Sequence, residues 1–326
     1  MTEVFTMFKR IGFVLAAAVL SFPAGAQVWP SKPVRFVVPA GQGGTIDPLT
    51  RFFADAYTKA LGQSFVIENR PGAQGNTGLA SVAKADPDGY TIGMAASSMI
   101  AINPHLYAKM PYDPRKELTG IVLVGDVPNI LVVNPDVPVK TLAEFTAYVK
   151  ANGAKLNFGS TGNGSSMHLA GELYKTLTGT VMTHIPYKVP ADATNDLISG
   201  RTQLMFQLMT GIQGQVKAGR VRPIAVLSDQ RWPGLPDVPT TVEQGMGNLK
   251  SSVWFAVVAP NGVPQVVIER INAETNSLLG DAAFRARVQA LGAAPMGGSP
   301  ADYRKLYDDE YTRWAQVVKV SGAKID

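Results

Sequence analysis

A pattern that recurs along the chain limits its fold more than any other feature: an apolar strand, then a glycine-rich loop, then a helix. In the first occurrence, Asp47-Pro48 opens the helix, because Asp is a good N-cap residue and Pro suits the first helical position. Strands and helices then alternate in the order β-α-β-α-β. This order predicts an α/β fold with a parallel sheet, whose loops gather at the carboxyl ends of the strands. The expected elements are strands at 34–38, 64–68 and 90–95, and helices at 47–61 and 77–85.

The same pattern returns in the stretch from Leu156 to Gly171. A short strand at 156–158 leads into a small polar loop, and Ser165 is a suitable N-cap for a helix that runs to Thr178. Gly179 then suits the left-handed residue that closes a helix. One face of this helix is apolar at i, i+3, i+4 and i+7 and is expected in the core, at Ala170, Leu173, Tyr174 and Leu177.

Both loops that precede these helices have the character of anion sites. The loop from Ser160 to Asn163 offers four backbone N–H groups on small residues and contains no acid. A helix N-terminus adds unpaired N–H groups and a favourable dipole. The loop from Gln42 to Asp47 is the second such turn, with the Asp47 carboxylate expected to cap its own helix. A purely structural role stays open for both, because most strand-to-helix turns bind nothing.

We expect the ligand-binding residues at this edge of the sheet. Ser97-Ser98 ends the third strand and points hydroxyls the same way as the loops. His168 lies roughly opposite the core stripe of its helix and is expected to face the cleft or the solvent, whereas His105 and His184 are expected to be structural. The full candidate set is Gln42, Gly43, Gly44, Thr45, Ile46, Asp47, Ser97, Ser98, Ser160, Thr161, Gly162, Asn163, Gly164, Ser165, His168 and Gln207.

Composition excludes several classes of site. The chain has 326 residues and no cysteine, which excludes disulfides, thiolate metal sites and a cysteine nucleophile. Its three histidines lack the spacing of a metal pair on one helix, and no pattern indicates a cofactor. The formal net charge of +5 suits an anionic ligand, but the chain has no basic run of the kind that nucleic acid needs.

Residues 1–26 have the pattern of a secretory signal. Lys9 and Arg10 form the charged region, the apolar segment 11–20 follows, and Ala24-Gly25-Ala26 is a cleavage pattern. The apolar segment is far shorter than the roughly 20 residues that span a bilayer. We expect export, removal of residues 1–26 and a soluble periplasmic protein, without a lipid anchor because no cysteine is present to carry one.

The alternation of elements changes midway along the chain, where two domains are expected to meet. Two apolar runs at 121–125 and 130–133, separated by Asp126-Val127-Pro128-Asn129, are interpreted as the first crossing between domains. The chain is expected to return in a second crossing near 222–256. The predicted boundaries are 27–124 plus 228–326 for domain I and 125–227 for domain II.

Two enzyme-like interpretations lack residues that their chemistry needs. Gly41-x-Gly43 follows a strand, as in a dinucleotide site, but Ile46 stands where the third glycine belongs, and the export signal argues against a nicotinamide cofactor. Ser165 and His168 lie on one helical turn with no evident acid to orient the histidine. The chain is therefore not expected to be an enzyme.

Short motifs follow one another along the whole chain after residue 26. They are Trp29-Pro30-Ser31-Lys32-Pro33-Val34, Gly43-Gly44-Thr45-Ile46-Asp47, Glu68-Asn69-Arg70-Pro71-Gly72-Ala73, Pro87-Asp88-Gly89-Tyr90-Thr91, Asn103-Pro104-His105-Leu106-Tyr107, Pro111-Tyr112-Asp113-Pro114, Phe158-Gly159-Ser160, His168-Leu169-Ala170-x-Glu172 and His184-Ile185-Pro186-Tyr187-Lys188. Each motif alone is common, but together and in this order they are specific. The chain resembles the Bug receptors, the TctC-type extracytoplasmic solute-binding proteins of tripartite tricarboxylate transporters.

The resemblance implies a two-domain periplasmic binding protein of α/β, type II-like fold, with two crossing segments and a ligand cleft between the domains. In this family, backbone groups of the loop after the first strand commonly hold one ligand carboxylate. Here that loop is Gln42 to Asp47, and the loop Ser160 to Ser165 meets the other end of the ligand. Gln203 and Gln207 stand where the family usually has Asp. If the second acid contacts a cationic ligand group, Gln207 argues against an amine and for a dicarboxylate or an aromatic carboxylate.

The resemblance therefore implies capture of a small organic acid for uptake by membrane transporter subunits. We expect a monomer with no nucleic-acid partner. Two alternatives use the same anion sites, namely an exported α/β enzyme that acts on a carboxylate and a ligand-sensing module for a membrane receptor. Turnover of a bound acid would identify the enzyme, whereas binding without turnover leaves the other two functions open.

Overall fold

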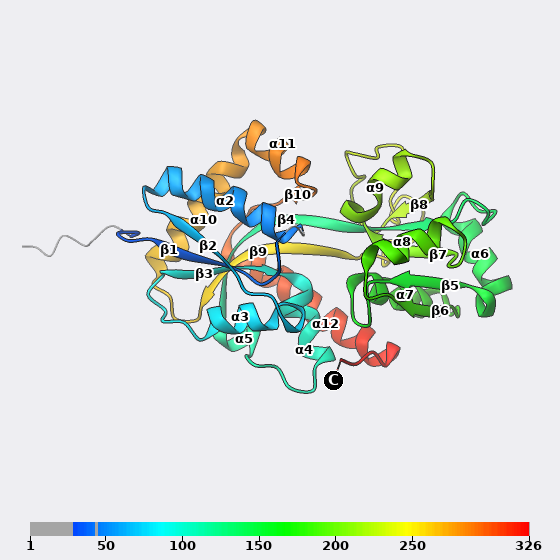
Figure 1. Cartoon of the computed structure of the whole chain (residues 1–326), viewed down its shortest axis with the longest axis horizontal. Helices are drawn as coiled ribbons and strands as arrows, with labels where there is room; N and C mark the ends of the chain where they lie inside the picture. Colours follow the sequence, from blue (N-terminus) through cyan, green and yellow to red (C-terminus); the bar gives the residue numbers. More distant parts are fainter. Residues whose placement is uncertain (1–28, 43–44, 326) are drawn as a thin grey trace, which may run out of the picture.

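The computed structural model describes residues 29–42 and 45–325 and shows an α/β fold arranged as two lobes joined by long strands (Figure 1). The predictions for residues 1–26, Gly43 and Gly44 lie outside the described residues. Within the described ranges, no helix combines the length and the apolar character needed to cross a membrane.

The first lobe is the predicted parallel β-α-β-α-β unit. Its strands lie in the order β2-β1-β3, and α2 and α10 cover one face while α3 covers the other (Figure 1). Phe36 and Val37 are successive residues of β1 and are buried in the cores on opposite faces of the sheet, as strand alternation requires. The elements are β1 (Val34–Val38), α2 (Ile46–Leu61), β2 (Phe65–Asn69), α3 (Asn76–Ala83), β3 (Thr91–Ala96), α10 (Gln265–Gly280), α11 (Ala282–Ala290) and β10 (Ala294–Pro295).

The second lobe repeats the strand–loop–helix pattern on a smaller scale. Helix α7 begins after the Ser165 N-cap and ends before Gly179, whose φ is 64°, as predicted. The expectation that Leu177 is in the core is wrong, because its side chain is 40% exposed. Periodicity sets the direction of a side chain, but only a neighbouring element can bury it. The elements are α6 (Leu142–Asn152), β5 (Asn157–Ser160), α7 (Ser166–Thr178), β6 (Thr183–Pro186), α8 (Pro190–Ile198), β7 (Leu204–Leu208), α9 (Met209–Lys217) and β8 (Arg222–Val226).

A single long strand, β4 (Leu118–Val133), connects the lobes, so the predicted interruption at Asp126-Val127-Pro128-Asn129 is wrong. The strand continues because its hydrogen-bonding partners change there. The antiparallel strand β9 (Ser252–Pro260) pairs with β4 as far as Pro128, and β7 pairs with it from Asn129 onward. Both crossings therefore lie side by side in one ten-stranded sheet.

Asn129 forms hydrogen bonds at the position where the two crossing segments meet. Its N–H donates to Ser251 O at 2.8 Å, and its carbonyl accepts from Leu227 N at 2.9 Å. Its side chain donates to Phe206 O at 2.9 Å and accepts from Ser251 Oγ at 3.0 Å. All polar groups of this fully buried residue thus join β4 to β7 and to the returning chain at 227 and 251.

The last helix, α12 (Pro300–Ser321), packs against both lobes. Tyr303 and Tyr307 belong to a core of the first lobe, whereas Trp314 and Val317 are buried with α7 in the core of the second. The precise domain boundaries remain a prediction. The short helical segments that complete the described chain are η1 (Ala73–Gly75), η2 (Ser98–Ile102), α4 (Asn103–Leu106), α5 (Pro114–Glu117) and η3 (Gly153–Lys155).

Candidate functional site

The turn between β1 and α2, residues 39–47, is here called the α2 turn. Helix α2 begins at Ile46, before the predicted N-cap residue Asp47, and the expectation that Asp47 caps it is wrong. Placed inside the first helical turn, the buried Asp47 carboxylate instead accepts from Arg51 Nε at 3.2 Å and from Asn69 Nδ2 at 2.8 Å. Asn69 also donates to Ala40 O at 3.1 Å. The α2 turn therefore already contains a carboxylate bonded to a cation and an amide.

The turn between β5 and α7, residues 160–165, is here called the α7 turn, and it contains no charged residue. Gly162 has φ 118° and donates its N–H to Ser160 Oγ at 3.1 Å. Ser165 Oγ donates to Gly162 O at 2.8 Å and accepts from His168 N at 3.3 Å. Not all four predicted N–H groups are therefore available to a ligand, because the turn uses that of Gly162 itself.

Other N–H groups of the α7 turn remain available. The backbone hydrogen bonds of the described chain include none from Thr161 N or Asn163 N. Ser166 and Met167 lie in the first turn of α7, where N–H groups have no partner within the helix. Asn163 is exposed and Thr161 is partly exposed. These N–H groups are the part of the predicted anion site that has no partner among the described residues.

His168 does not face the cleft or the solvent as expected, because its ring is buried against that of His184 on β6. The two rings stack with centroids 3.8 Å apart and an interplanar angle of 18°. His168 Nδ1 accepts from Gly164 N at 3.1 Å, and His184 Nε2 lies 2.6 Å from Ser160 Oγ. The periodicity argument failed because β6, a strand distant in sequence, covers this face of α7.

Burial and nearby positive charge keep both histidines neutral. Burial lowers the pKa of His168 to about 3, with His184 and Lys175 adding to the effect. Burial and Lys175 lower the pKa of His184 to about 4. Lys175 Nζ pairs with the buried Glu172 at 2.8 Å, and Glu172 Oε1 lies 3.7 Å from His168 Nε2.

The Ser160–His184 contact has the distance of a nucleophile–base pair but not its setting. Ser160 is fully buried, and its hydroxyl is already bonded to Gly162. A histidine with a pKa near 4 is also a poor general base at neutral pH. The contact therefore acts as a support for the α7 turn.

The other predicted residues are spread around the same strand ends. Ser97 is buried at the end of β3, and its Oγ has no hydrogen-bond partner among the described residues. Ser98 is partly buried and Gln42 is exposed. Gln207 is buried on β7, where its Oε1 accepts from Leu208 N at 2.9 Å at the start of α9.

Two contacts between segments distant in sequence link the predicted turns to residues that were not predicted as site residues. Thr45 Oγ1 lies 3.4 Å from Thr210 Oγ1 on α9. Gly164 packs so closely on Leu106 of α4 that a Cβ there would lie 2.4 Å from the leucine side chain. Such contacts leave no periodic signal, because each depends on how segments distant in sequence meet.

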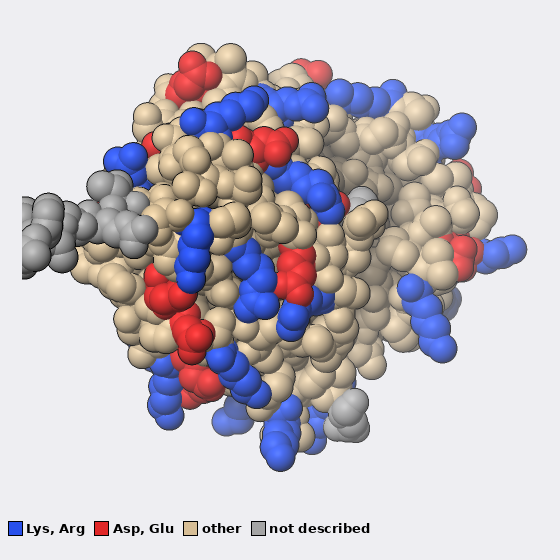
Figure 2. Space-filling view, turned by 60° about the vertical axis from the view of Figure 1, so that its left-hand side comes forward, with Lys and Arg blue, Asp and Glu red and all other residues tan. Residues whose placement is uncertain are grey.

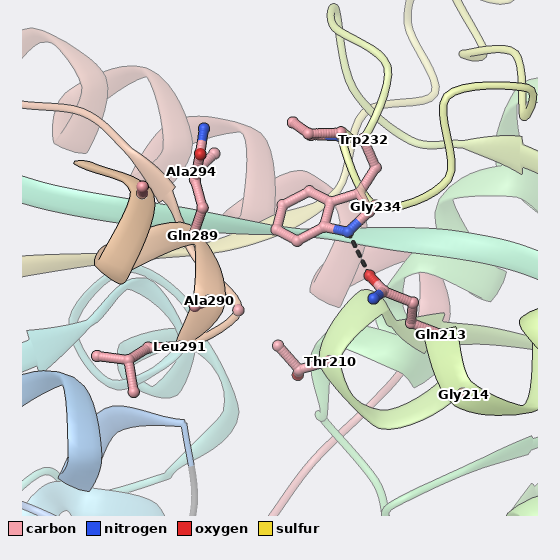
Figure 3. A pocket seen from close by; sticks show the side chains of 12 residues that line it. Thr210, Gln213, Gly214, Trp232, Gly234, Gln289, Ala290, Leu291 and Ala294 are labelled. Carbon is pink, nitrogen blue, oxygen red and sulfur yellow. Dashed lines mark hydrogen bonds between the residues drawn. The ribbon is translucent and has the colours of Figure 1, made fainter. Parts of the chain in front are cut away.

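Next to the Thr45–Thr210 contact, the lobes enclose a cavity of about 600 Å³ (Figure 3). Trp232 and Gln213 line one side and are hydrogen-bonded to each other, and Ala290 and Leu291 of the first lobe line the other. All twelve lining residues are uncharged. On the face shown in Figure 2, basic and acidic side chains are intermixed over the first lobe, and the hollow between the lobes is mostly uncharged.

Comparison with known proteins agrees with this architecture over almost the whole chain. Residues 49–323 match the family model described as "Tripartite tricarboxylate transporter family receptor" (TctC). Protein BugT of Bordetella pertussis is 35% identical over 316 residues, which cover 97% of each chain.

Solved structures of similar proteins also match almost the whole chain. The R. palustris protein Rpa4515, solved with adipate, is 36% identical with a TM-score of 0.78, over 91% of this chain and 99% of that one. MatC from Rhodopseudomonas palustris, solved with malate, is 30% identical with a TM-score of 0.72, over 89% and 100%. With two α/β lobes, paired crossing strands and these relatives, the chain belongs to the TctC family of tripartite tricarboxylate transporter receptors, the periplasmic solute-binding proteins that include the Bug receptors.

Proposed function

We propose that this receptor captures a small organic acid between its lobes, with one carboxylate held by the α7 turn and the other end of the ligand at the α2 turn. The observation that carries the proposal is the acid-free α7 turn, whose N–H groups at Thr161 and Asn163 have no partner in the described chain. Together with the N-terminus of α7, they favour negative charge at this position.

The relatives support a ligand that carries two carboxylates. Adipate is bound in one similar structure and malate in another, and both are dicarboxylates. Gln207, buried close to the start of α9, brings no negative charge to the cleft and so favours an acid over an amine. The uncharged cavity beside Thr210 has room for the body of a larger acid. The binding test therefore also includes an aromatic carboxylate.

The test is a thermal-shift screen followed by calorimetric titration with adipate, malate, benzoate, glucose and putrescine. An acid at 100 times its dissociation constant is expected to add about 2.7 kcal/mol to the free energy of unfolding. If glucose or putrescine binds more tightly than every acid, the proposed ligand class is wrong.

The same samples separate the alternative functions. NMR spectra of the bound acid over hours report turnover, which would favour the exported enzyme. A ligand that contacts both lobes must bind the closed arrangement better than the open one. X-ray scattering should therefore show compaction at saturation, and an unchanged radius of gyration would exclude closure around the ligand.

We further propose that residues 1–26 direct export and are then removed, so that the mature receptor works in the periplasm as a monomer. It would deliver its ligand to the membrane subunits of a tripartite transporter. N-terminal sequencing of periplasmic material should begin near Gln27, and pull-down of membrane subunits should depend on bound acid. A retained leader would overturn the proposed processing.

A further inference from the structure

The feature of interest is the support under the α7 turn, which consists of His168 and His184. One histidine comes from the first turn of α7 and the other from β6, so two separate elements hold the turn. Each ring contacts a different part of it: His168 bonds to Gly164, and His184 bonds to Ser160.

The hydrogen bonds define the state of the His168 ring. Its Nδ1 accepts a hydrogen from Gly164 N at 3.1 Å, so Nδ1 carries no proton and the ring proton lies on Nε2. Nε2 in turn faces the carboxylate of Glu172, which is bonded to Lys175. Gly164 therefore donates to His168, and the Nε2–H of His168 faces the Glu172 carboxylate at 3.7 Å, while Lys175 donates to that same carboxylate.

The second ring supports the other end of the turn. Ser160 Oγ lies 2.6 Å from His184 Nε2 and accepts from Gly162 N at 3.1 Å. Because His184 holds the Ser160 hydroxyl in place, the Gly162 N–H is bonded within the turn and is not available to a ligand. Stacking of the two rings at 3.8 Å then joins the two ends of the turn into one support.

We propose that His168 and His184 are positioning residues, which act as a neutral stacked pair to hold the α7 turn so that its N–H groups at Thr161 and Asn163 face the ligand carboxylate. The inference rests on the proposed function and adds to it the residues that set the shape of the anion site. A ligand carboxylate lies on the other side of the turn, so the rings act through Gly164 and Ser160 without contacting the ligand.

The uncharged state of the pair is essential to this arrangement. A proton on His168 Nδ1 would face the Gly164 N–H and remove the acceptor, and two stacked cations would repel each other. The charged groups that affect the pair are Glu172 and Lys175, both on α7, and burial adds to the effect of Lys175. At neutral pH the acceptor is therefore always present.

The decisive experiment compares two variants of His168, one that removes the hydrogen-bond acceptor and keeps a ring, and one that keeps an acceptor without the ring. His168→Phe retains the shape and the stacking but has no acceptor, whereas His168→Asn presents a carbonyl oxygen near the position of Nδ1. We expect calorimetric affinity for adipate or malate in the full chain to fall at least about tenfold in His168→Phe and to recover to within about threefold of the parent in His168→Asn. His184→Phe and His184→Gln should form the same contrast at Ser160.

His105→Gln is the matched control, since His105 bonds to Tyr311 O rather than to the turn and should leave affinity unchanged. Equal affinities of the Phe and Asn variants would overturn the inference. If the Phe variants do not fold, the ¹⁵N shifts of the parent decide: an unprotonated His168 Nδ1 between pH 6 and 8 supports the proposal, and a protonated one refutes it.

The outcomes also separate this inference from the proposed function. A parent protein that binds none of the acids contradicts the proposed function itself. A parent that binds an acid while the histidine variants bind it equally well contradicts only the positioning role.

Discussion

The α2 turn and the α7 turn have the same local design but differ in their charged groups. Each joins a parallel strand to a helix, yet the α2 turn holds the buried Asp47 bonded to Arg51 and Asn69, whereas the α7 turn holds only neutral groups supported by two neutral histidines. A carboxylate in the first turn of a helix already uses the favourable field of that helix. We therefore propose that the α7 turn would contribute the stronger electrostatic attraction for a ligand anion, and that the α2 turn would contribute mainly shape and backbone contacts.

The largest effect is expected when the α7 turn is given the charge that the α2 turn already has. Asn163→Asp places a carboxylate beside the bound anion, and two like charges about 4 Å apart at an effective dielectric constant of 20 repel by roughly 4 kcal/mol. We expect calorimetric affinity for the acid to fall by more than about 100-fold, with little change in the apo melting temperature because Asn163 is exposed. Asn261→Asp, at an exposed site on another loop, is the control. Parent-like affinity in Asn163→Asp would mean that the anion binds elsewhere.

Gly162→Pro should disrupt the internal bonds of the α7 turn. Proline cannot adopt the φ of 118° found at Gly162 and has no N–H to donate to Ser160. We expect an affinity loss of roughly 10- to 100-fold, from backbone strain of about 1–3 kcal/mol together with the lost bond. Gly162→Ala keeps the N–H and should lose less. Equal titration curves for the two variants would show that the N–H is unimportant.

Acidification should destabilise the folded chain through the two histidines that support the α7 turn. The pKa values of His168 and His184 are lowered to about 3 and 4 from an ordinary value of 6.5, so the unfolded chain takes up these protons first. Their contribution to stability is complete above about pH 6.5 and is lost as the pH falls toward 4. Asp126 acts in the opposite direction, since burial raises its pKa to about 6.

The net result is a predicted loss of about 2 kcal/mol in the free energy of unfolding between pH 7 and pH 5. Urea unfolding of the parent and of His184→Gln at both pH values measures it, and the variant should lose less. A protein that becomes more stable on acidification would contradict this account of the pair.

Asp47→Asn tests the α2 turn directly. Removal of the charge eliminates the ion pair with Arg51, which keeps its bond to Asn69 Oδ1, and weakens the bond from Asn69 Nδ2. These losses are expected to lower the free energy of unfolding by about 1–2 kcal/mol. Ligand affinity should change by less than about threefold, because the carboxylate is a structural part of the turn. An affinity gain as large as the loss in Asn163→Asp would reverse the assignment of the two turns.

The smallest effect is expected for Thr161→Ala. The Thr161 hydroxyl has only a weak contact with Met167 Sδ at 3.7 Å, and the backbone N–H that we assign to the ligand is retained. We expect the binding free energy to weaken by about 0.5–1.5 kcal/mol, the net contribution of one ordinary hydrogen bond. A calorimetric loss equal to that of Gly162→Pro would show that side chains, and not the backbone, hold the acid.

Local signals in the sequence were sufficient to locate several of the elements. Ser165 and Gly179 mark the ends of α7 because capping depends on the residues at the helix ends, and β1 was located because a run of apolar residues suits a strand buried on both faces. The order of strands and helices likewise predicted the parallel unit of the first lobe, since this order allows few topologies. The motifs then identified the family without any contact information.

Only the tertiary structure decided the features that arise where two segments distant in sequence meet. The carboxylate of Asp47 bonds to Asn69 rather than capping its helix because β2 lies next to the start of α2. His168 is buried because β6 brings His184 onto its ring, and β4 is continuous because β7 takes over its pairing at Asn129. Periodicity and capping describe a segment in isolation, whereas burial, hydrogen-bond partners and pKa values depend on the neighbours that folding brings to it.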